Sequence, residues 1–354
     1  MILNVVKIFL PTALAFSFGI LITPRLTYYM YKYKLWKKVA RSENEGITNG
    51  DFKQVHNKEE ELSTPRVGGV IIWLSLILCV GAIWLIGKVF PSDLSLKLDF
   101  FSRSQTLIPI AALLLGAGIG LIDDILQVSG KATLYANDAI NYRKIKVIAI
   151  VAIGALIGSW FYFKLGITSV AIPFIGTQLA LGWFFIPFFI LILLAVFSTS
   201  VIDGIDGLAG GVLAVIFASY AIIAYGKDMI DIAALCGVIA GSILAFLWFN
   251  IPPARFYMGE TGILGLMVVL TVIAFLTDTV LLLPIIALPL AATTASVIIQ
   301  IISYKYFGKR RVFKIAPLHH HFKALGWPAY KVVMRYWVVS VICSIVGVVI
   351  ALAG

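Results

Sequence analysis

Apolar runs of about twenty residues recur along nearly the whole chain. Roughly 20 apolar residues are what a helix needs to cross the hydrocarbon core of a bilayer. Of the 354 residues, 61% are hydrophobic and only 13% are charged, which excludes a soluble globular domain. We therefore predict an all-α polytopic membrane protein whose residues 1–354 form a single integral membrane domain.

The apolar runs predict about ten transmembrane helices. In the third run, Gly116 and Gly120 form a small-xxx-small pair, which indicates close packing against another helix. After the fourth run, segment 164–179 combines a proline and two glycines with β-branched residues, so we expect a small external β-hairpin there. The spans are expected near residues 5–27, 67–88, 106–122, 146–163, 180–199, 207–225, 230–249, 262–277, 279–303 and 332–353.

The basic residues are distributed unevenly between the two sides that ten spans define. Most lysines and arginines lie in four loops on one side, and both chain termini lie on the other. The positive-inside rule assigns the basic side to the cytoplasm and both termini to the outside. The formal net charge of +11 then needs no nucleic acid as a partner. The cytoplasmic loops are expected at residues 28–66, 123–146, 250–261 and 304–331.

Two aspartates interrupt the apolar sequence near the middle of the chain. Asp203 and Asp206 lie between two apolar runs, in a stretch that also contains four glycines. An unpaired charge within a bilayer costs several kcal/mol or more, so acids placed here indicate a function. If a helix begins near Asp203, the spacing puts both carboxylates on one face, and the glycines leave that face open to a ligand.

Further carboxylates fall at the cytoplasmic ends of other predicted spans. Asp123 and Asp124 follow the third span, and adjacent carboxylates repel each other unless a cation lies between them. This pair therefore fits either a proton acceptor or a metal site. Glu260 opens the eighth span, where an acid favourably placed at a helix N-terminus explains this residue as well as a functional role does. Together these carboxylates suit Mg²⁺, which is bound by oxygen atoms and keeps water molecules that a phosphate can replace.

Three of the four histidines in the chain are consecutive, at His319, His320 and His321. Successive helical residues point about 100° apart, so three such imidazoles do not converge on one metal ion within a helix. Contact with a phosphate or a sugar is the better use for them. Carboxylates, a divalent cation, lysines and histidines on one face of a membrane indicate phosphoryl transfer from a soluble anionic donor to a lipid acceptor.

These motifs resemble those of the polyprenyl-phosphate sugar-phosphate transferases, and the resemblance runs nearly end to end. The histidine motif is the most specific part, because other branches of the family carry a different histidine pattern. It resembles the branch whose donor is UDP-MurNAc-pentapeptide. The matching motifs lie at residues 64–69, 123–124, 203–209, 247–250, 258–260 and 316–322.

The resemblance implies a ten-helix, Mg²⁺-dependent enzyme of the bacterial cytoplasmic membrane, whose active site faces the cytoplasm. Such an enzyme transfers phospho-MurNAc-pentapeptide from UDP-MurNAc-pentapeptide to undecaprenyl phosphate. The products are UMP and lipid I, an intermediate of peptidoglycan synthesis and cell wall biogenesis. The resemblance also implies a homodimer.

The resemblance implies a role for each matching residue. Asp123 or Asp124 would handle the acceptor phosphate and its proton, and Asp203 would act at the diphosphate of the donor. His319 would be the most important histidine, and Glu260 would take the place of the magnesium-binding aspartate of the family. The implied substrate-binding residues are Lys58, Lys146, Ser200, Asp206, Asn250, Tyr257, His320 and His321.

Some of these substrate contacts can be stated more closely from the resemblance. Asp206 and Asn250 would contact the uridine of the donor, and Tyr257 would stack near its base. Lys146 matches a lysine that meets a phosphate in the family. Lys58 is the nearest match to a second such lysine.

Four positions depart from the family pattern. Ser200 stands where the family has asparagine, Glu260 where it has aspartate, and Ile263 where it has serine. The longer side chain of Glu260 still offers an oxygen to Mg²⁺, but it shifts the ion by about one bond length. Arg66 follows the branch that uses UDP-N-acetylhexosamine donors.

Two other functions stay open at this point. A sibling transferase for a UDP-N-acetylhexosamine agrees with Arg66, although the three consecutive histidines argue against it. An ion-coupled or proton-coupled transporter would also place acids within the membrane. A transporter carries them near the bilayer midplane within broken helices, whereas here they fall at one face, which favours the enzyme.

Overall fold

The computed structural model describes residues 2–38, 62–101, 104–129 and 132–353. Ten helices in this part of the chain are long and apolar enough to cross a membrane, which confirms the predicted all-α membrane fold. These spans contain α1 (Ile2–Lys32), α4 (Val70–Val89), α6 (Ser104–Val128), α7 (Ala132–Leu165), α8 (Phe185–Ser198), α9 (Leu208–Gly226), α10 (Ile230–Asn250), α11 (Gly259–Leu276), α13 (Leu288–Tyr306) and α15 (Ala329–Ala353). Helix α8 reaches spanning length only together with the 3-10 helices on either side of it, over Gly182–Ile202.

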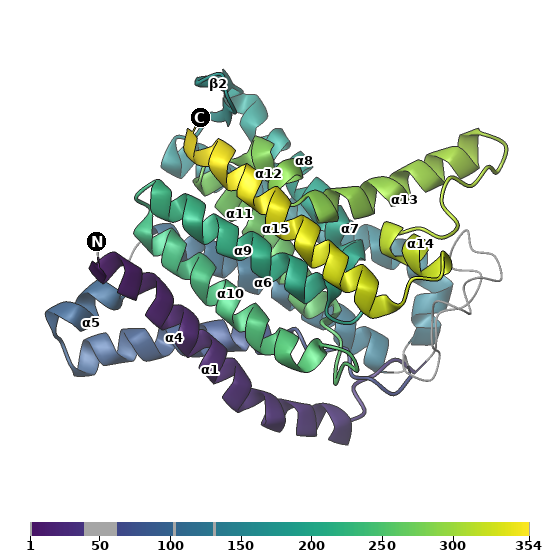
Figure 1. Ribbon diagram of the computed structural model, residues 1–354, viewed down its shortest axis with the longest axis horizontal. Helices are drawn as coiled ribbons and strands as arrows, with labels where there is room; N and C mark the ends of the chain where they lie inside the picture. The colour runs from purple at the N-terminus through teal and green to yellow at the C-terminus, as the bar shows by residue number, and fades with distance from the viewer. Residues whose placement is uncertain (1, 39–61, 102–103, 130–131, 354) are drawn as a thin grey trace.

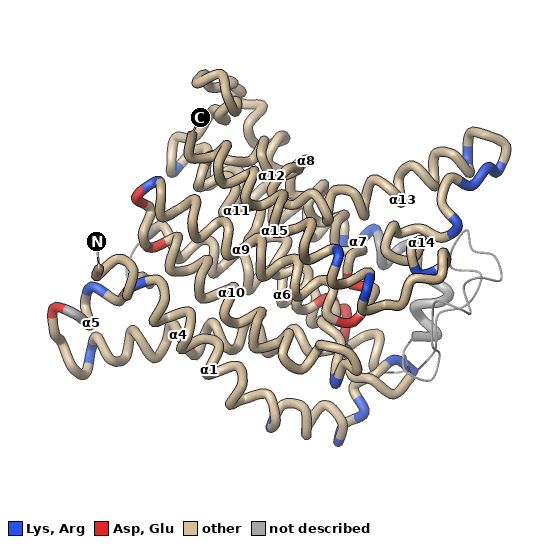
Figure 2. Tube along the Cα trace, in the orientation of Figure 1, with Lys and Arg blue, Asp and Glu red and all other residues tan. Residues whose placement is uncertain are grey.

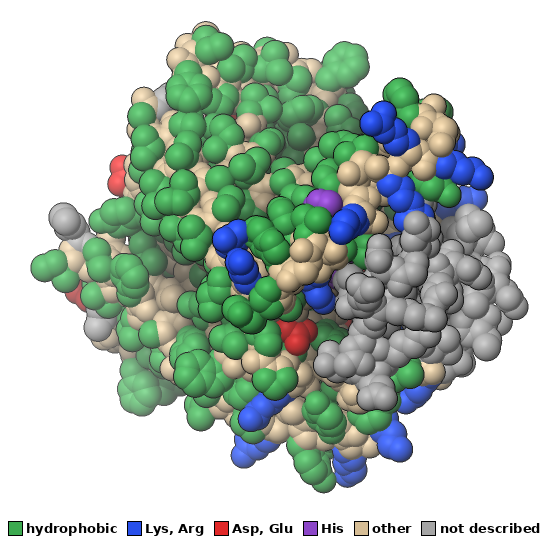
Figure 3. Space-filling view, turned by 45° about the vertical axis from the view of Figure 1, so that its right-hand side comes forward, with side chains coloured by type: hydrophobic (Ala, Val, Ile, Leu, Met, Phe, Trp, Pro, Cys, Tyr) green, Lys and Arg blue, Asp and Glu red, His purple; other side chains and the backbone are tan. Residues whose placement is uncertain are grey.

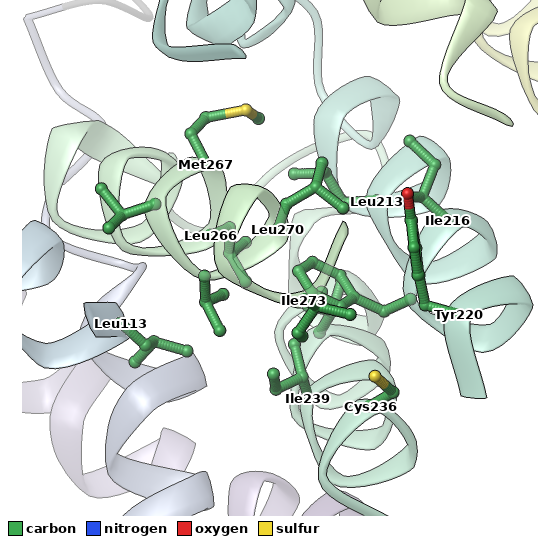
Figure 4. Close-up of a cluster of buried hydrophobic side chains, with 14 of the residues drawn as sticks. Leu113, Leu213, Ile216, Tyr220, Cys236, Ile239, Leu266, Met267, Leu270 and Ile273 are labelled. Carbon is green, nitrogen blue, oxygen red and sulfur yellow. The ribbon is translucent and has the colours of Figure 1, made fainter. Parts of the chain in front are cut away.

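Three central helices, α9, α10 and α11, form the core of the bundle. Nearly every residue of α11 from Gly259 to Phe275 is buried, because a helix that is apolar all round must be covered by other helices or by lipid. Helix α6 packs along α11, and α1 packs along α10. Figure 4 shows the apolar side chains that meet between these helices, among them Leu113, Leu213, Ile239 and Leu270.

The close packing predicted for Gly116 and Gly120 is confirmed. A Cβ atom on Gly120 would lie 2.1 Å from the carbonyl oxygen of Glu260, and one on Gly116 would lie 2.8 Å from that of Leu264. Any side chain at either position would therefore separate α6 from α11. This contact fixes the first turn of α11 against α6.

The outer helices are exposed to the surroundings along much of their length. Helix α13 projects away from the bundle, as Figure 1 shows, and it follows the short helices η4 (Val280–Leu282) and α12 (Leu283–Ile286). The ninth predicted span, 279–303, is therefore interrupted. Prolines lie in the first turns of both α12 and α13, where a missing backbone N–H costs no hydrogen bond.

A two-stranded antiparallel hairpin connects α7 to α8, which confirms the hairpin expected near 164–179. Strand β1 (Ser169–Ile172) pairs with β2 (Thr177–Ala180), and Ile172 lies opposite Thr177. The backbone N–H of Ala171 donates a hydrogen bond of 2.8 Å to the Asp278 carboxylate. The turn after α11 therefore holds the hairpin in place.

Both chain termini lie at the same end of the bundle in Figure 1, as ten spans require. Near the opposite end, Figure 2 shows many of the lysines and arginines around a group of acidic residues. The described residues also form four short helices: α5 (Asp93–Leu98), η2 (Gly182–Phe184), η3 (Thr199–Ile202) and α14 (Leu318–Ala324). Helices α6 and α7 both extend into the range 123–146, so the connection expected there is much shorter.

Candidate functional site

A partly buried lysine bridges two carboxylates, and the three residues come from three different helices. Lys146 of α7 lies with its Nζ atom 2.9 Å from Oδ2 of Asp123 on α6 and 3.2 Å from Oε1 of Glu260 on α11. Only 1% of the Asp123 side chain is exposed, whereas 25% of the Glu260 side chain is exposed. One positive charge thus faces two carboxylates, and the group stays attractive to another cation.

Glu260 keeps one carboxylate oxygen uncommitted. Its Oε2 atom is buried and has no hydrogen-bond partner among the described residues. A buried acceptor without a donor costs free energy unless a ligand or water satisfies it. This oxygen is therefore a place where a cation or a donor group can bind.

The two adjacent aspartates have different partners. Asp124 is fully buried, and its two oxygens accept hydrogen bonds from the backbone N–H groups of Glu260 (3.1 Å) and Thr261 (2.9 Å). These N–H groups belong to the first turn of α11 and have no partner within that helix. Asp124 therefore caps α11 from a neighbouring helix, and it fixes the backbone of Glu260. Asp123 instead faces Lys146.

The segment at 64–69 holds the chain before α11 in place. Backbone N–H groups of Gly68 and Gly69 donate to the carbonyl oxygens of Tyr257 (2.9 Å) and Met258 (2.8 Å). The N–H of Tyr257 donates to Pro65 in return, at 2.8 Å. These bonds leave little freedom for the residues that lead into Glu260.

Asp203 and Asp206 lie in the turn that precedes α9. The helix begins at Leu208, after Gly207 with φ of +77°, so the shared helical face considered for the two aspartates does not form. A left-handed residue interrupts helical geometry, and glycine adopts it without a Cβ clash. Both carboxylates are instead placed by a loop.

Asn250, the last residue of α10, joins this loop to the segment before α11. Its Oδ1 atom accepts a hydrogen bond of 2.9 Å from the N–H of Gly207, and its Nδ2 atom donates one of 2.9 Å to the carbonyl of Phe256. The N–H of Ala254 also donates to Oδ2 of Asp206, at 3.2 Å. These bonds connect the loop that carries Asp203 and Asp206 to the segment that leads into Glu260.

Two of the three consecutive histidines face the aspartate loop. His319 and His320 are buried on α14, with ring centroids 4.3 Å apart. A Cβ atom on Gly204 would lie 2.5 Å from Nε2 of His319 and 3.1 Å from Nε2 of His320. Only a glycine beside Asp203 allows this approach, and the imidazoles thus reach the loop.

His321 points elsewhere. Its Nδ1 atom accepts a hydrogen bond of 3.2 Å from the backbone N–H of Lys314, and its ring packs edge-on against Phe313. Partial burial, together with the nearby charge of Lys314, lowers the pKa of His321 below its usual value. The structure therefore does not bring His321 to the residues gathered around Asp203.

The remaining predicted residues fall around this site or outside the described part of the chain. Ser200 lies in the 3-10 helix η3 (Thr199–Ile202), where its carbonyl accepts a hydrogen bond from the N–H of Asp203 at 3.2 Å. Tyr257 lies on the segment that pairs with 65–69. Lys58 lies outside the described residues.

Two residues that the sequence did not indicate contribute to the site. Gln127 donates a hydrogen bond of 3.1 Å from Nε2 to Oδ2 of Asp123. It follows Asp123 by one helical turn, so the contact could have been found if the third span had been extended past the aspartates. Trp337 donates from its indole N–H to the carbonyl of Gly207 at 3.2 Å, and no sequence signal marks this long-range contact.

The carboxylates fit a magnesium ion that takes part of its coordination from a substrate. Among the described residues, no three side chains of the His, Cys, Asp or Glu types form a ready metal cage. Mg²⁺ is usually bound by one or two carboxylates and completes its octahedron with water and phosphate oxygens. Glu260, with its uncommitted buried oxygen, provides a ligand of this kind.

The site reaches the molecular surface. Figure 3 shows acidic side chains at one point of the surface with lysines, arginines and a histidine around it. A negatively charged patch of this kind attracts a divalent cation, and the surrounding basic groups attract an anionic substrate. The arrangement can therefore bring a metal ion and a phosphate together.

Comparisons with known proteins agree with this chemistry. Residues 106–278 match the sequence pattern of a family described as Glycosyl transferase family 4. A phospho-N-acetylmuramoyl-pentapeptide-transferase of Listeria innocua is 31% identical over 342 residues, which cover 96% of this chain and 97% of that protein. Proteins of the same name from Shouchella clausii and Bacillus subtilis are 33% and 30% identical, and each alignment covers 95% of both chains.

Proposed function

The chain belongs to glycosyl transferase family 4, which transfers phosphosugars to polyprenyl phosphates, and on that premise we propose that it transfers phospho-MurNAc-pentapeptide. The donor would be UDP-MurNAc-pentapeptide and the acceptor undecaprenyl phosphate. The phosphosugar moves from the donor to an oxygen of the acceptor phosphate, and UMP leaves. The product is lipid I, which serves peptidoglycan synthesis.

The observation that carries this proposal is the bridge that Lys146 forms between Asp123 and Glu260. Relatives named for this activity match the chain along nearly its full length, so the match includes the segment around His319. Enzyme active sites of this kind need fixed positive and negative groups around a transferring phosphorus. The bridged residues provide both signs of charge within one site.

We assign the acceptor phosphate to Asp123 and leave Asp124 as a structural residue. Both oxygens of Asp124 already accept backbone hydrogen bonds from α11. Asp123 faces Lys146, whose ammonium can attract a phosphate and lower the cost of bringing it near a carboxylate. Asp123 is therefore the residue placed to take a proton from the acceptor phosphate.

Glu260 would hold Mg²⁺ through its uncommitted oxygen. When bound, the ion supplies positive charge that stabilises the negative charge on the transferring phosphate and on the leaving UMP. Asp203 would contribute at the diphosphate, and His319 and His320 would donate hydrogen bonds to phosphate or sugar oxygens beside it. Asp206 would face the uridine, together with Tyr257.

The proposal places the protein in the bacterial cytoplasmic membrane with this site facing the cytoplasm. The donor is a soluble anion made in the cytoplasm, and the basic end of the bundle faces it. A homodimer remains the expected assembly from the resemblance of the sequence. Asn250 holds the site together through its backbone contacts, and contact with the uridine would use its remaining hydrogen-bonding capacity.

The test uses purified protein, undecaprenyl phosphate, Mg²⁺ and one of two donors. UMP release and a lipid product with UDP-MurNAc-pentapeptide, but not with UDP-GlcNAc, would support the proposal. Product with UDP-GlcNAc alone would assign the protein to the sibling branch that Arg66 resembles. No product from either donor would contradict the transferase and reopen ion-coupled transport.

A further inference from the structure

Two cationic side chains share one indole ring at the start of α15. The guanidinium carbon of Arg335 lies 4.2 Å from the ring centroid of Trp327, and Nζ of Lys331 lies 5.1 Å from it. The indole itself stacks on Phe322, with ring centroids 4.9 Å apart and planes 19° apart. Arg335, Lys331 and Trp327 together are called the cation clamp below.

The clamp carries an excess of positive charge. Neither Arg335 nor Lys331 forms an ion pair with any carboxylate in the part of the chain that the structure describes. Two cations held on one ring repel each other, although each gains from the ring's negative face. An anion placed between them would remove that repulsion and accept charge-assisted hydrogen bonds from both.

The clamp continues into a lipid-facing surface. Arg335 and Lys331 lie four residues apart and therefore on one face of α15, a membrane-spanning helix. The same face then presents exposed apolar side chains: Met334, Val338, Ile342 and Ile345 are 57%, 63%, 57% and 54% exposed. Along this face, a basic pair is followed by exposed apolar side chains, which suits a molecule with an anionic headgroup and an apolar chain.

The clamp faces away from the phosphosugar site. Tyr336 and Trp337, on other sides of the same helical turn, point toward the site: Tyr336 packs near His319, and Trp337 bonds to Gly207. Since residues on a helix turn by about 100° each, the side chain of Arg335 leaves α15 in another direction. A phosphate held by the clamp would therefore lie at the perimeter of the bundle and not beside Asp123.

We propose that the cation clamp binds the phosphodiester headgroup of an anionic bilayer phospholipid, with an acyl chain lying along the exposed face of α15. Figure 2 shows basic residues on the first turns of this helix, at the end that the positive-inside rule assigns to the cytoplasm. Long basic side chains reach the headgroup level from such positions. The bound lipid belongs to the inner leaflet.

Native mass spectrometry of the full-length protein, titrated with phosphatidylglycerol or with phosphatidylcholine, tests this proposal. Each basic residue near an anionic membrane surface contributes about 1 kcal/mol. Arg335→Gln and Lys331→Gln should therefore each lower the affinity for the first bound phosphatidylglycerol molecule by about fivefold. Arg335→Lys keeps the charge but loses the flat stacking group, and it should weaken binding less. Phosphatidylcholine should bind all variants equally.

Lys38→Gln is the matched control, because Lys38 is an exposed cation over a single indole, that of Trp36, at 5.4 Å. It should leave phosphatidylglycerol binding unchanged. Equal binding to wild type, Arg335→Gln and Lys331→Gln would overturn the proposal. A larger loss for undecaprenyl phosphate than for phosphatidylglycerol in Arg335→Gln would overturn it too, because the clamp would then serve the acceptor. None of these readouts depends on transfer activity.

Discussion

The two ends of the helix bundle bury charge in different ways. At the end that holds both chain termini, which the positive-inside rule assigns to the outside and which is called the outer end below, Lys7 of α1 pairs with Asp231 of α10 at 2.6 Å. The two side chains are 11% and 13% exposed. At the inner end, Lys146 faces Asp123 and Glu260 together. The outer pair balances one cation with one anion, whereas the inner group has one negative charge more than it has positive charge.

This difference separates a structural ion pair from a binding site. A balanced pair needs nothing further, and it joins two helices within an apolar environment. An unbalanced group with an uncommitted carboxylate oxygen is completed by a ligand. We therefore expect changes at the outer end to affect stability alone and changes at the inner end to affect transfer.

The largest expected effect is on stability, at the outer end. Lys7→Met would remove the cation that the largely buried Asp231 carboxylate contacts at 2.6 Å, and breaking a buried pair costs about 3–5 kcal/mol. We expect a lower midpoint of thermal unfolding in detergent, with an unchanged transfer rate per folded molecule. The double variant Lys7→Met/Asp231→Leu should recover most of the loss, and a double variant as unstable as the single one would contradict this account.

The sequence predicts much of the fold because length and apolarity alone mark a membrane span. The ten spans and the outer hairpin follow from apolar runs and turn residues. The Lys7–Asp231 pair does not follow, because Lys7 interrupts an apolar run without any local sign of its partner far along the chain. The sequence does not predict that α13 projects from the bundle either, because the direction of a helix depends on how it packs against its neighbours.

The sequence also does not predict which partner each residue of the site contacts. The sequence marks Asp123 and Asp124 as a pair, but helical neighbours point about 100° apart and meet different elements. Whether each aspartate meets Lys146 or the first turn of α11 is decided by how α6 and α11 pack. The three histidines divide in the same way, since His321 faces Lys314 and the other two face Gly204.

At the inner end, Glu260→Gln should lower the Mg²⁺-dependent rate of UMP release. Removing one group that stabilises charge at a reacting centre costs roughly 10²–10³-fold in rate. The amide keeps the shape of the side chain, so the midpoint of thermal unfolding should change little. Asp228→Asn, an exposed acid at the outer end, is the control and should retain the full rate. Full Mg²⁺-dependent activity of Glu260→Gln would exclude the metal role of this residue.

A smaller change tests whether helix packing positions the inner group. Gly120→Ala places a Cβ atom 2.1 Å from the Glu260 carbonyl, and overpacking of this kind costs about 1–3 kcal/mol. We expect both the transfer rate and the unfolding midpoint to fall, since α6 and α11 must separate. Gly118→Ala lies on the same helix with no atom within 4 Å, and it should preserve both quantities. Equal effects of the two alanines would show that the contact does not position Glu260.

The smallest effect concerns His321, which lies at the inner end but outside the group around Asp203. Its Nδ1 atom accepts a hydrogen bond from Lys314 N–H, so only the imidazole without a proton on Nδ1 can form it. Burial and Lys314 lower the pKa of His321 in the folded state, so the unfolded chain binds the proton more readily. The stabilisation is therefore present above the unfolded pKa of about 6.5 and is lost as the pH falls through the folded value.

His321→Gln removes this titration. The bond is solvent-exposed, so the free energy of unfolding of the wild type should exceed that of the variant by less than about 1 kcal/mol at pH 7.5, and this difference should decrease as the pH is lowered from 7.5 to 5. Thermal unfolding of both proteins across this pH range measures the difference. Groups that the two proteins share titrate equally in both, so their contributions cancel when the two are subtracted. A difference independent of pH would contradict the protonation account. We expect His321→Gln to retain the transfer rate at pH 7.5, because His321 does not face the aspartate loop. A large loss of rate would mean that the donor contacts residues beyond those gathered around Gly204.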